Sequence, residues 1–594
     1  MIVTDDNIHD AVFRIRQDKI RAADTETFGL KYTDLPFSII VGTRTEAFYF
    51  NLLDYATGER GLSPESIALL KPVFEDSDVI WFLHNAKFDM HKLAKYGINI
   101  HGTVWDTKTH ARILKNNLLD YSLETLCKDQ INKKSSAVDE YIEANGLFTR
   151  RKVPGKQKIV KDLHYNLVPF DIIYDYGIKD VNATMELGLN QMKAYEESPS
   201  LHRVRDNEVA LIKAIYEMEK EGVAIDPSYV MAAWEHEEKQ IQLSKAKFAA
   251  AYGIQYDDSS KNDLVEILKS EGETISFTAA GNPCLDKDHL KLMSSPAAEL
   301  IKEIRHYEKR ISSFYSTFME FRDPYNVIHP NADPAGTETG RFSMSEPNLQ
   351  QLSKDDKAED GDFTVRGCFV ARRGFFFAQF DYSQQEYRIL ADYAKETQLI
   401  DRIAKGHDVH QATADLVGIT RNEAKTVNFA ILYGAGAAKL ALMLKISLAD
   451  AKKLIRRYFA AMPAVEMFIE RVKGTGASRG SIFNWFGRRY NIAKREWAYI
   501  LPNHLIQGSG ADVCKTAILK VHNYLKLNGL KSRIIMTVHD SIILEISADE
   551  VHIIENIKRL MENSYEPRNG VILKVDVEIS SKSLSKKDLK KYAA

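Results

Sequence analysis

Two strongly apolar runs that favour β-structure lie far apart in this chain, and each has an aspartate where the apolar pattern stops. RGFFFAQFDYS (residues 373–383) predicts a strand that ends at Asp381. RIIMTVHDSIILEI (residues 533–546) predicts two strands of a hairpin with Asp540 between them, although the turn lacks glycine. If these strands are adjacent in one sheet, the two carboxylates meet and could hold a pair of Mg²⁺ ions.

Length and composition indicate a multidomain globular protein. The chain has 594 residues, too many for one compact core, so roughly two to four domains are expected. Hydrophobic residues make up 44% and charged residues 27%, as in ordinary soluble proteins, and no apolar run is long enough to cross a membrane. The N-terminal residues lack the order of a signal peptide, and the four cysteines include no CxxC pair. We therefore expect no disulfides, no zinc site and a cytoplasmic location.

The pattern along the chain divides it into an α/β domain and a second, larger region. Over residues 1–195, apolar runs such as AFYFNLL and DVIWFLHN alternate with helical patterns, which indicates an α/β domain. The polar segment AYEESPS (residues 194–200) is typical of a linker. A mostly helical stretch then continues to about residue 325, before the predicted strand at Asp381. The sequence thus predicts an α/β multidomain fold.

A group of acidic residues in the first domain has the composition of a metal site. Asp24 and Glu26 are two residues apart, so on a strand both side chains leave the same face. HNAKFD supplies Asp89, and YGIKD supplies Tyr176 and Asp180, which are four apart and hence neighbours on one helix face. Oxygen ligands of this kind suit Mg²⁺ or Mn²⁺, and two such ions can activate water for phosphodiester hydrolysis. By itself an Asp-x-Glu pair is common on protein surfaces.

The order of these segments, DTET, HNAKFD and YGIKD, resembles the three motifs of the DEDD proofreading exonucleases, in the subtype that contains tyrosine. The resemblance implies an active 3′–5′ exonuclease with an RNase H-like fold. It implies that Tyr176 positions the attacking water and that four acids bind the metal ions: Asp24, Glu26, Asp89 and Asp180. Asp106, in VWDT, is interpreted as structural.

A third feature is the segment RNEAKTVNFAILYG, which has four chemically distinctive side chains at a spacing of four. Arg421, Lys425, Phe429 and Tyr433 form one slanting stripe on a helix that Gly434 can end, because each step of four drifts only about 40°. Such a stripe offers two cations to a triphosphate and two aromatic rings to a base and sugar. An ordinary amphipathic helix would instead separate the cations from the rings.

DYSQQEYR, RNEAKTVNFAILYG and VHDS resemble, in the right order, motifs A, B and C of the family A (polymerase-I-like) DNA polymerases. TGRFSMSEPNLQQL, VRGCFVA, HDVHQATA and NHLIQGSGAD resemble further segments of that family. The resemblance implies a right-hand polymerase domain over residues 196–594, acting on primer–template DNA and dNTPs with two Mg²⁺ ions, or Mn²⁺, in each active site. It implies a thumb at about 226–325, fingers at about 399–499, and a palm formed by about 200–225, 326–398 and 500–594.

The resemblance also implies roles for individual residues. The metal ligands would be Asp381 and Asp540. The nucleotide-binding residues would be Arg421, Lys425, Phe429, Tyr433, His410, Gln384 and Glu386, the last acting as a steric gate against a ribose 2′-hydroxyl. Residues near primer or template would be Arg341, Asn348, Gln350, Asn503, Gln507 and His539, and Arg366 would lie near the triphosphate.

The chain departs from the family pattern at a few positions. Ser541 stands where motif C often has glutamate, and Gln385 and Tyr387 replace aliphatic residues beside the gate. No long insertion interrupts the segment between Gly222 and Thr339, so the loop that recruits thioredoxin in some phage relatives is not expected. Replisome partners, such as a helicase–primase or a single-strand binding protein, are not identified by the sequence. No 5′-nuclease domain is recognised, which favours a bacteriophage replicative enzyme over a bacterial or organellar one.

Three other functions compete with this interpretation. A single-subunit RNA polymerase shares the palm aspartates and a Lys…Tyr-Gly helix, but Glu386 and the exonuclease motifs argue against it. A nuclease with an unrelated C-terminal half conflicts with motifs A to C. A catalytically inactive DNA-binding protein conflicts with the intact acids Asp381 and Asp540 and the intact cations Arg421 and Lys425.

Overall fold

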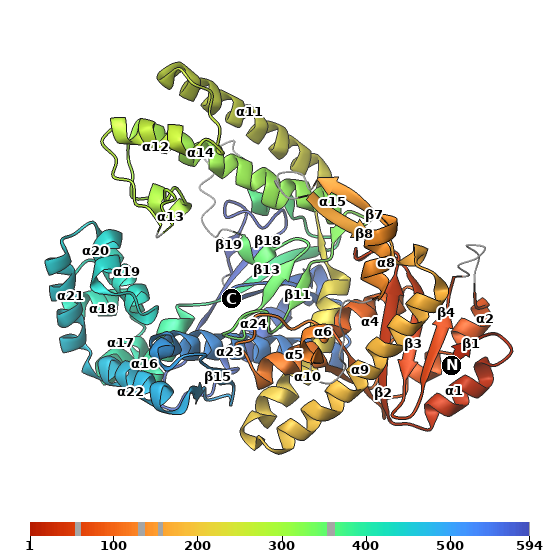
Figure 1. Ribbon diagram of the computed structural model, residues 1–594. Coiled ribbons are helices and arrows are strands. Elements are labelled where there is room, and N and C mark those ends of the chain that lie inside the picture. Colours follow the sequence, from red (N-terminus) through yellow and green to blue (C-terminus); the bar gives the residue numbers. More distant parts are fainter. Residues whose placement is uncertain (54–60, 129–136, 153–158, 279, 353–362, 593–594) are drawn as a thin grey trace.

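The computed structural model of the protein describes residues 1–53, 61–128, 137–152, 159–278, 280–352 and 363–592. An N-terminal α/β part and a larger C-terminal part lie side by side (Figure 1). None of the helices in these described ranges combines the length and the apolar character that crossing a membrane requires.

The N-terminal part is built on a six-stranded sheet with the strand order β1-β4-β3-β2-β5-β6. Strand β2 lies near its centre, antiparallel to β3 and parallel to β5. The strands are β1 (Ile2–Val3), β2 (Ile20–Thr27), β3 (Pro36–Gly42), β4 (Ala47–Asn51), β5 (Ile80–Leu83) and β6 (Thr103–Asp106). The helices are α1 (Ile8–Arg16), α2 (Pro64–Ala68), α3 (Lys71–Phe74), α4 (Ala86–Ala94), α5 (Thr107–Leu114), α6 (Leu123–Leu126), α8 (Ala137–Asn145) and α9 (Phe170–Glu196), with a hairpin of β7 (Phe148–Lys152) and β8 (Ile159–Leu163).

The predicted linker at residues 194–200 is wrong. Helix α9 continues to Glu196, and a short 3₁₀ turn (Pro199–Leu201) leads directly into α10 (His202–Glu221). Tyr195 is fully buried, and its hydroxyl lies 3.0 Å from Nδ1 of His110. The polar composition of the segment misled the prediction, because its few apolar side chains bury themselves in a hydrophobic core that the two parts of the chain share.

The C-terminal part contains a five-stranded antiparallel sheet with the order β16-β17-β13-β18-β19. The strand predicted at Asp381 and the predicted hairpin are both confirmed. The strands of this sheet are β13 (Phe375–Tyr382), β16 (Arg533–Val538), β17 (Ser541–Ser547), β18 (Val575–Ser580) and β19 (Lys590–Lys591). Short two-stranded ribbons are formed by β9 (Val223–Ala224) with β10 (Val327–Ile328), β11 (Asn331–Asp333) with β12 (Ser343–Ser345), and β14 (Ser481–Phe483) with β15 (Arg489–Asn491).

Two sets of helices extend from this sheet in different directions (Figure 1). One is a projecting arm of α11 (Pro227–Tyr252), α12 (Lys261–Ser270), α13 (Lys287–Leu290), α14 (Pro296–Arg310) and α15 (Ser316–Phe321). The other, which follows β13, contains α16 (Gln385–Ala394), α17 (Thr397–Ala404), α18 (Val409–Val417), α19 (Arg421–Leu432), α20 (Ala437–Leu444), α21 (Leu448–Ala461) and α22 (Pro463–Arg479). The long helix α23 (Leu501–Leu527) and the shorter α24 (Ile554–Glu562) pack together beside the sheet.

Two candidate active sites

The first candidate site begins on strand β2. Asp24 and Glu26 lie on this strand as predicted, Asp24 half-buried and Glu26 buried. Helix α4 brings Asp89 to the same strand, where the Asp89 carboxylate accepts a hydrogen bond of 2.7 Å from the Thr25 hydroxyl. Burial and the nearby charge of Asp24 raise the pKa of Asp89 well above its usual range. A cation between these carboxylates would offset both effects.

Helix α9 completes this group with Tyr176 and Asp180, one turn apart. Gly177 lies between them, and a Cβ at this position would stand 3.1 Å from Ile40 of strand β3, so glycine permits the helix to approach the sheet closely. Burial, followed by the charges of Asp180, Glu26 and Asp24, raises the pKa of Tyr176 far above its ordinary value. The Tyr176 hydroxyl therefore remains a neutral hydrogen-bond donor beside the acids.

The structure thus brings the five residues predicted for this site to one location. Within the described ranges, no group of three or more His, Cys, Asp or Glu side chains is arranged so that it could hold a metal ion as it stands. Asp106, by contrast, lies at the start of α5, where its carboxylate accepts from the backbone N–H groups of Lys108 and Asn85 at 3.0 Å. This bonding confirms its structural interpretation.

The second candidate site forms where β13 and β17 meet. Asp381 is paired with Ser541 across the two strands, and the Tyr382 N–H donates to the carbonyl oxygen of Asp540 at 3.3 Å. Burial, followed by the charges of Asp540 and Asp381, raises the pKa of the Cys514 thiol to about 12. The adjacency of the two strands, on which the predicted metal pair depended, is confirmed.

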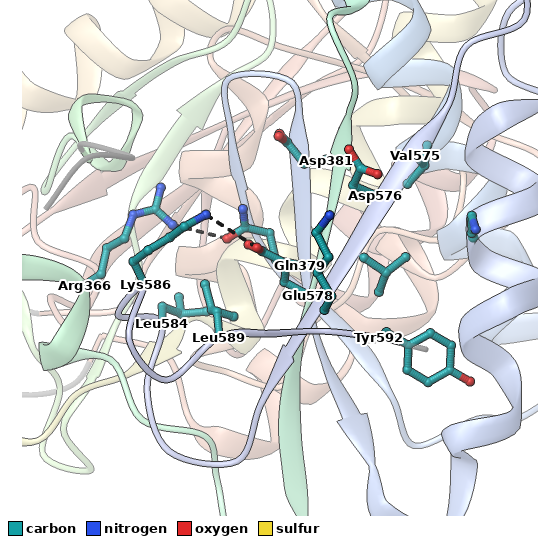
Figure 2. Close-up of a pocket in the computed structure, with 13 residues that line it drawn as sticks. Arg366, Gln379, Asp381, Val575, Asp576, Glu578, Leu584, Lys586, Leu589 and Tyr592 are labelled. Carbon is teal, nitrogen blue, oxygen red and sulfur yellow. Dashed lines mark hydrogen bonds and ion pairs between the residues drawn. The ribbon is translucent and has the colours of Figure 1, made fainter. Parts of the chain in front are cut away.

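A third carboxylate beside Asp381 was missed from the sequence. Asp576 of β18 is paired with Asp381 on the side opposite to Ser541, and Figure 2 shows the Asp381 and Asp576 carboxylates next to each other. Ser383 donates to Asp576 at 2.6 Å. Both aspartates line a pocket of about 360 Å³, deeper in which Arg366 donates to Gln379 at 3.2 Å. The alternating pattern of VDVEIS is typical of a strand, but it was not singled out from the sequence, and nothing in it specifies the partner strand.

Helix α19 carries the predicted stripe next to this site. Arg421 and Lys425 are exposed, Phe429 is half-buried, and Tyr433, just past the helix end, is 45% exposed. A Thr420 capping box fixes the start of the helix. The opposite face is apolar and buried, through Ala424, Val427, Ala430 and Ile431. The two cations and two rings therefore share the outward face, as the spacing predicted.

A pocket of about 560 Å³ lies between α16, α19, α23 and the β16–β17 turn. Many of the predicted nucleotide and DNA residues line it, including Asp540, Glu386, His410, Phe429, Tyr433 and Arg341. Asp381 lines the neighbouring pocket of about 360 Å³ instead. Other predicted residues outside the lining are Arg421, Lys425, Asn348, Asn503 and Gln507. The side chains of Asn503 and Gln507 both come from α23, where Gln507 is buried.

Two arginine side chains of the site form ion pairs with carboxylates. Arg341 forms an ion pair with Glu386, and the Tyr433 hydroxyl donates to Glu386 at 3.4 Å. Arg421 donates two hydrogen bonds to Asp408, at 2.8 and 3.1 Å. Asp408 was not identified from the sequence; its side chain also caps the start of α18.

Asp408 is also hydrogen-bonded by Gln384, which in turn accepts from the Val409 N–H at 2.9 Å. Although burial opposes ionisation, the hydrogen bonds from Arg421 and Gln384 lower the pKa of Asp408 to about 2. Asp408 is therefore charged at all physiological pH values. Its two hydrogen bonds with Arg421 orient that guanidinium.

A buried polar chain supports His410. The Tyr387 hydroxyl is hydrogen-bonded to Tyr458 and donates to Asn428 at 2.6 Å, and the Asn428 amide lies 3.0 Å from Nδ1 of His410. Burial, assisted by the cations of Arg421 and Lys425, lowers the pKa of His410 to about 4, so its imidazole is neutral near pH 7. Tyr387 therefore has a physical role: it satisfies buried groups that an aliphatic side chain would leave without a partner.

Comparisons with known proteins match both parts of the chain. The family model described as "DNA polymerase family A" matches residues 228–585, and that described as "3′-5′ exonuclease" matches residues 1–193. DNA polymerase I of Pseudomonas aeruginosa is 29% identical over 589 residues, covering 93% of this chain and 62% of that protein. DNA polymerase DpoZ of Acinetobacter phage SH-Ab 15497 is 26% identical, covering 83% of this chain and 86% of the phage protein.

The fold is shared with a solved structure, the polymerase domain of Pol1 from M. smegmatis in complex with DNA primer–template and dNTP. The TM-score is 0.81 at 23% sequence identity, with 98% of this chain and 99% of that chain covered. This likeness confirms the multidomain fold expected from the sequence. The chain therefore belongs to DNA polymerase family A and carries a 3′–5′ exonuclease domain ahead of the polymerase domain.

Proposed function

We propose that the protein copies a DNA template by adding dNTPs to a primer 3′-hydroxyl and removes mismatched primer ends at a separate exonuclease site. The observation that carries this proposal is the adjacency of Asp381, on β13, and Asp540, in the turn that leads into the paired strand β17, beside a helix that presents two cations and two aromatic rings. The pair supplies oxygen ligands for cations, and the helix supplies complementary groups for a deoxynucleoside triphosphate.

Polymerase and exonuclease domains of these families generally depend on metal ions. We propose that Asp381 and Asp540 hold two Mg²⁺ ions, replaceable by Mn²⁺, and that Asp24, Glu26, Asp89 and Asp180 hold a second pair. Bound in these sites, the ions would activate the attacking oxygen and neutralise charge on the reacting phosphate. The raised pKa of Asp89 supports a cation at the exonuclease site, because a bound positive charge would favour the ionised form of neighbouring carboxylates.

The protein's own groups would then recognise the nucleotide. Arg421 would leave its ion pair with Asp408 and bind the triphosphate instead. Lys425 would be the second cation on the same helix face. His410 would donate or accept as a neutral imidazole next to Phe429, whose ring centre lies 5.8 Å away. Glu386, at the pocket wall with Arg341 and Tyr433, would occupy the space that a ribose 2′-hydroxyl needs. The ion pair between Glu386 and Arg341 must open if Arg341 is to reach the primer.

At the exonuclease site, the neutral Tyr176 hydroxyl would orient a water molecule toward the terminal phosphate. Its burial among Asp180, Glu26 and Asp24 keeps the proton on the phenol. The two sites lie in different parts of the chain, so we propose that the primer end moves between them when pairing fails.

We also assign the polymerase subdomains on the positions of the elements. The sheet with β13, β16 and β17 would be the palm, the projecting arm of α11 to α15 the thumb, and the helices α17 to α22 the fingers. The substrates would be primer–template DNA and dNTPs. The protein would act in the cytoplasm, which for a phage-encoded chain is the cytoplasm of the host cell. Phage polymerases among the relatives support a replicative role. We propose no thioredoxin partner and leave other replisome partners unnamed.

One prediction concerns sugar selection. Phe429→Tyr should increase incorporation of dideoxynucleotides relative to dNTPs by about ten- to a hundredfold. The added hydroxyl would supply the polar contact that a missing 3′-hydroxyl cannot make, a hydrogen bond near charged phosphate worth roughly 1.5–3 kcal/mol. Chain termination is measured at a fixed ratio of dideoxy- to deoxynucleotide. Leu440→Met, in the buried face of the neighbouring α20, is a matched packing control that should leave this ratio unchanged. Equal termination by Phe429→Tyr and the wild type would contradict the position assigned to Phe429.

The proposed function as a whole is tested by one assay. A 5′-labelled primer, matched or mismatched at its 3′ end, is incubated on a template with Mg²⁺, with and without dNTPs. We expect extension of the matched primer with dNTPs and shortening of both primers without them, faster for the mismatch. Extension with ribonucleotides at equal efficiency would favour the RNA polymerase alternative. Shortening without any extension would favour a nuclease, and neither reaction would indicate an inactive DNA-binding protein.

A further inference from the structure

The side chain of Gln350 joins two residues of the turn that carries Asp540. Its Nε2 donates to the carbonyl oxygen of Thr537 at 2.8 Å, and its Oε1 accepts from the backbone N–H of His539 at 2.7 Å. Gln350 comes from the 3₁₀ turn Leu349–Gln351, far from the hairpin in sequence. One amide thus fastens the backbone on the N-terminal side of Asp540 to a separate segment of the chain.

The turn needs such a fastening, because its backbone is unfavourable for the residue that occupies it. His539 has φ of +56°, the left-handed region that glycine usually fills, and its side chain is exposed. Inside the hairpin, the Thr537 hydroxyl donates to the Ser541 carbonyl at 3.0 Å and the Ser541 hydroxyl donates to the Val538 carbonyl at 2.8 Å. The hydrogen bond from the His539 N–H to Gln350 holds this strained residue from outside the hairpin.

Gln350 is itself held in place. The Asn348 side-chain oxygen accepts from the Gln350 backbone N–H at 3.1 Å, and the intervening Leu349 is fully buried. The amide is therefore presented by a rigid turn. Each of its two polar atoms makes one hydrogen bond to the hairpin backbone, so the hairpin fixes the orientation of the amide.

We infer that Gln350 is a positioning residue that sets the place of Asp540 relative to Asp381, and that it acts through the hairpin backbone instead of reading DNA. This inference rests on the proposed polymerase function. It revises the role expected from the sequence, in which Gln350 touched template or primer. Asn348 then acts indirectly, because its side chain accepts a hydrogen bond from the Gln350 backbone N–H and so orients Gln350.

The test compares three substitutions. Gln350→Met keeps the length but removes both hydrogen bonds, and Gln350→Glu keeps the acceptor for His539 but puts a carboxylate against the Thr537 carbonyl. Gln351→Ala, at the exposed neighbour on the same turn, is the matched control. Measurements are kcat and KM for single-nucleotide extension, Kd for primer–template DNA by fluorescence anisotropy, and Mn²⁺ affinity of the DNA complex by electron paramagnetic resonance. Exonuclease rate and thermal midpoint report on folding.

For Gln350→Met and Gln350→Glu we expect kcat to fall by about ten- to a hundredfold, because misplacing a catalytic group by about 1 Å has effects of this size. The Mn²⁺ affinity should weaken, while Kd for DNA and the exonuclease rate should stay within about twofold of the wild type. Gln351→Ala should match the wild type throughout. A rise in Kd for DNA with unchanged kcat would overturn the inference in favour of direct DNA contact. Unchanged kcat, Kd and Mn²⁺ affinity would overturn it as well. If the wild type itself does not extend primers, the proposed function fails instead.

Discussion

Asp381→Asn and Asp540→Asn should each lower primer extension by at least about a thousandfold while leaving the exonuclease active. Each substitution keeps the size and shape of the side chain. It replaces a charged carboxylate ligand of the two proposed metal ions by a neutral amide. Metal ions contribute several kcal/mol of transition-state charge stabilisation, and each 1.36 kcal/mol corresponds to a factor of ten. The measurement is single-turnover extension with excess enzyme, alongside digestion of single-stranded DNA by the same preparation.

The sheet should tolerate both changes, because its register depends on backbone hydrogen bonds between β13, β17 and β18. Asp576→Asn is the comparison that separates a ligand from a mere neighbouring charge. Asp576 is paired directly with Asp381 but is exposed and already accepts a hydrogen bond from Ser383. We expect its substitution to cost far less than that of Asp381. Near-normal extension by Asp381→Asn would remove the basis of the proposed polymerase site.

Local sequence patterns were sufficient for the elements that carry these acids. A run of apolar residues ending at Asp381 and a Val-His-Asp-Ser turn between apolar runs are strong β signals, and both elements exist. The spacing of four on α19 was equally reliable, because a stripe along one helix depends only on helical geometry. Resemblance to the polymerase and exonuclease families then connected these local features across the chain.

Contacts between remote segments could not be predicted in this way. Asp576 stands next to Asp381 only because β18 chooses β13 as its partner, and Asp408 meets Arg421 only because α18 packs on α19. The family resemblance placed Gln350 near primer or template, yet both polar atoms of its side chain are bonded to the β16–β17 hairpin. The prediction of a linker at residues 194–200 was wrong for a related reason. Its composition is polar, but the burial of Tyr195 is decided by Trp105 and His110 from the exonuclease domain.

Asp24→Ala combined with Glu26→Ala should abolish excision of a mismatched primer end and leave synthesis nearly unchanged. The two carboxylates lie on β2 next to Asp89 and the Tyr176 hydroxyl, so their loss removes half of the proposed ligand set at once. We expect the excision rate to fall by at least about a thousandfold, again from the loss of several kcal/mol of stabilisation by bound cations. Excision is followed on a 3′-mismatched duplex without dNTPs, and extension on a matched primer with them.

Folding should not suffer from this double substitution, since the Asp24 charge is one cause of the raised pKa of Asp89 and its removal relieves repulsion. The thermal midpoint should therefore stay at or above that of the wild type when no divalent cation is present. Asp175→Ala is a matched control on the same turn of α9 as Tyr176: its carboxylate is exposed and forms an ion pair with Lys179 on the surface, so both activities should survive. Loss of extension together with excision in the double variant, at an unchanged thermal midpoint, would show that the two sites are not independent. Retained excision would mean that these carboxylates do not hold the catalytic cations.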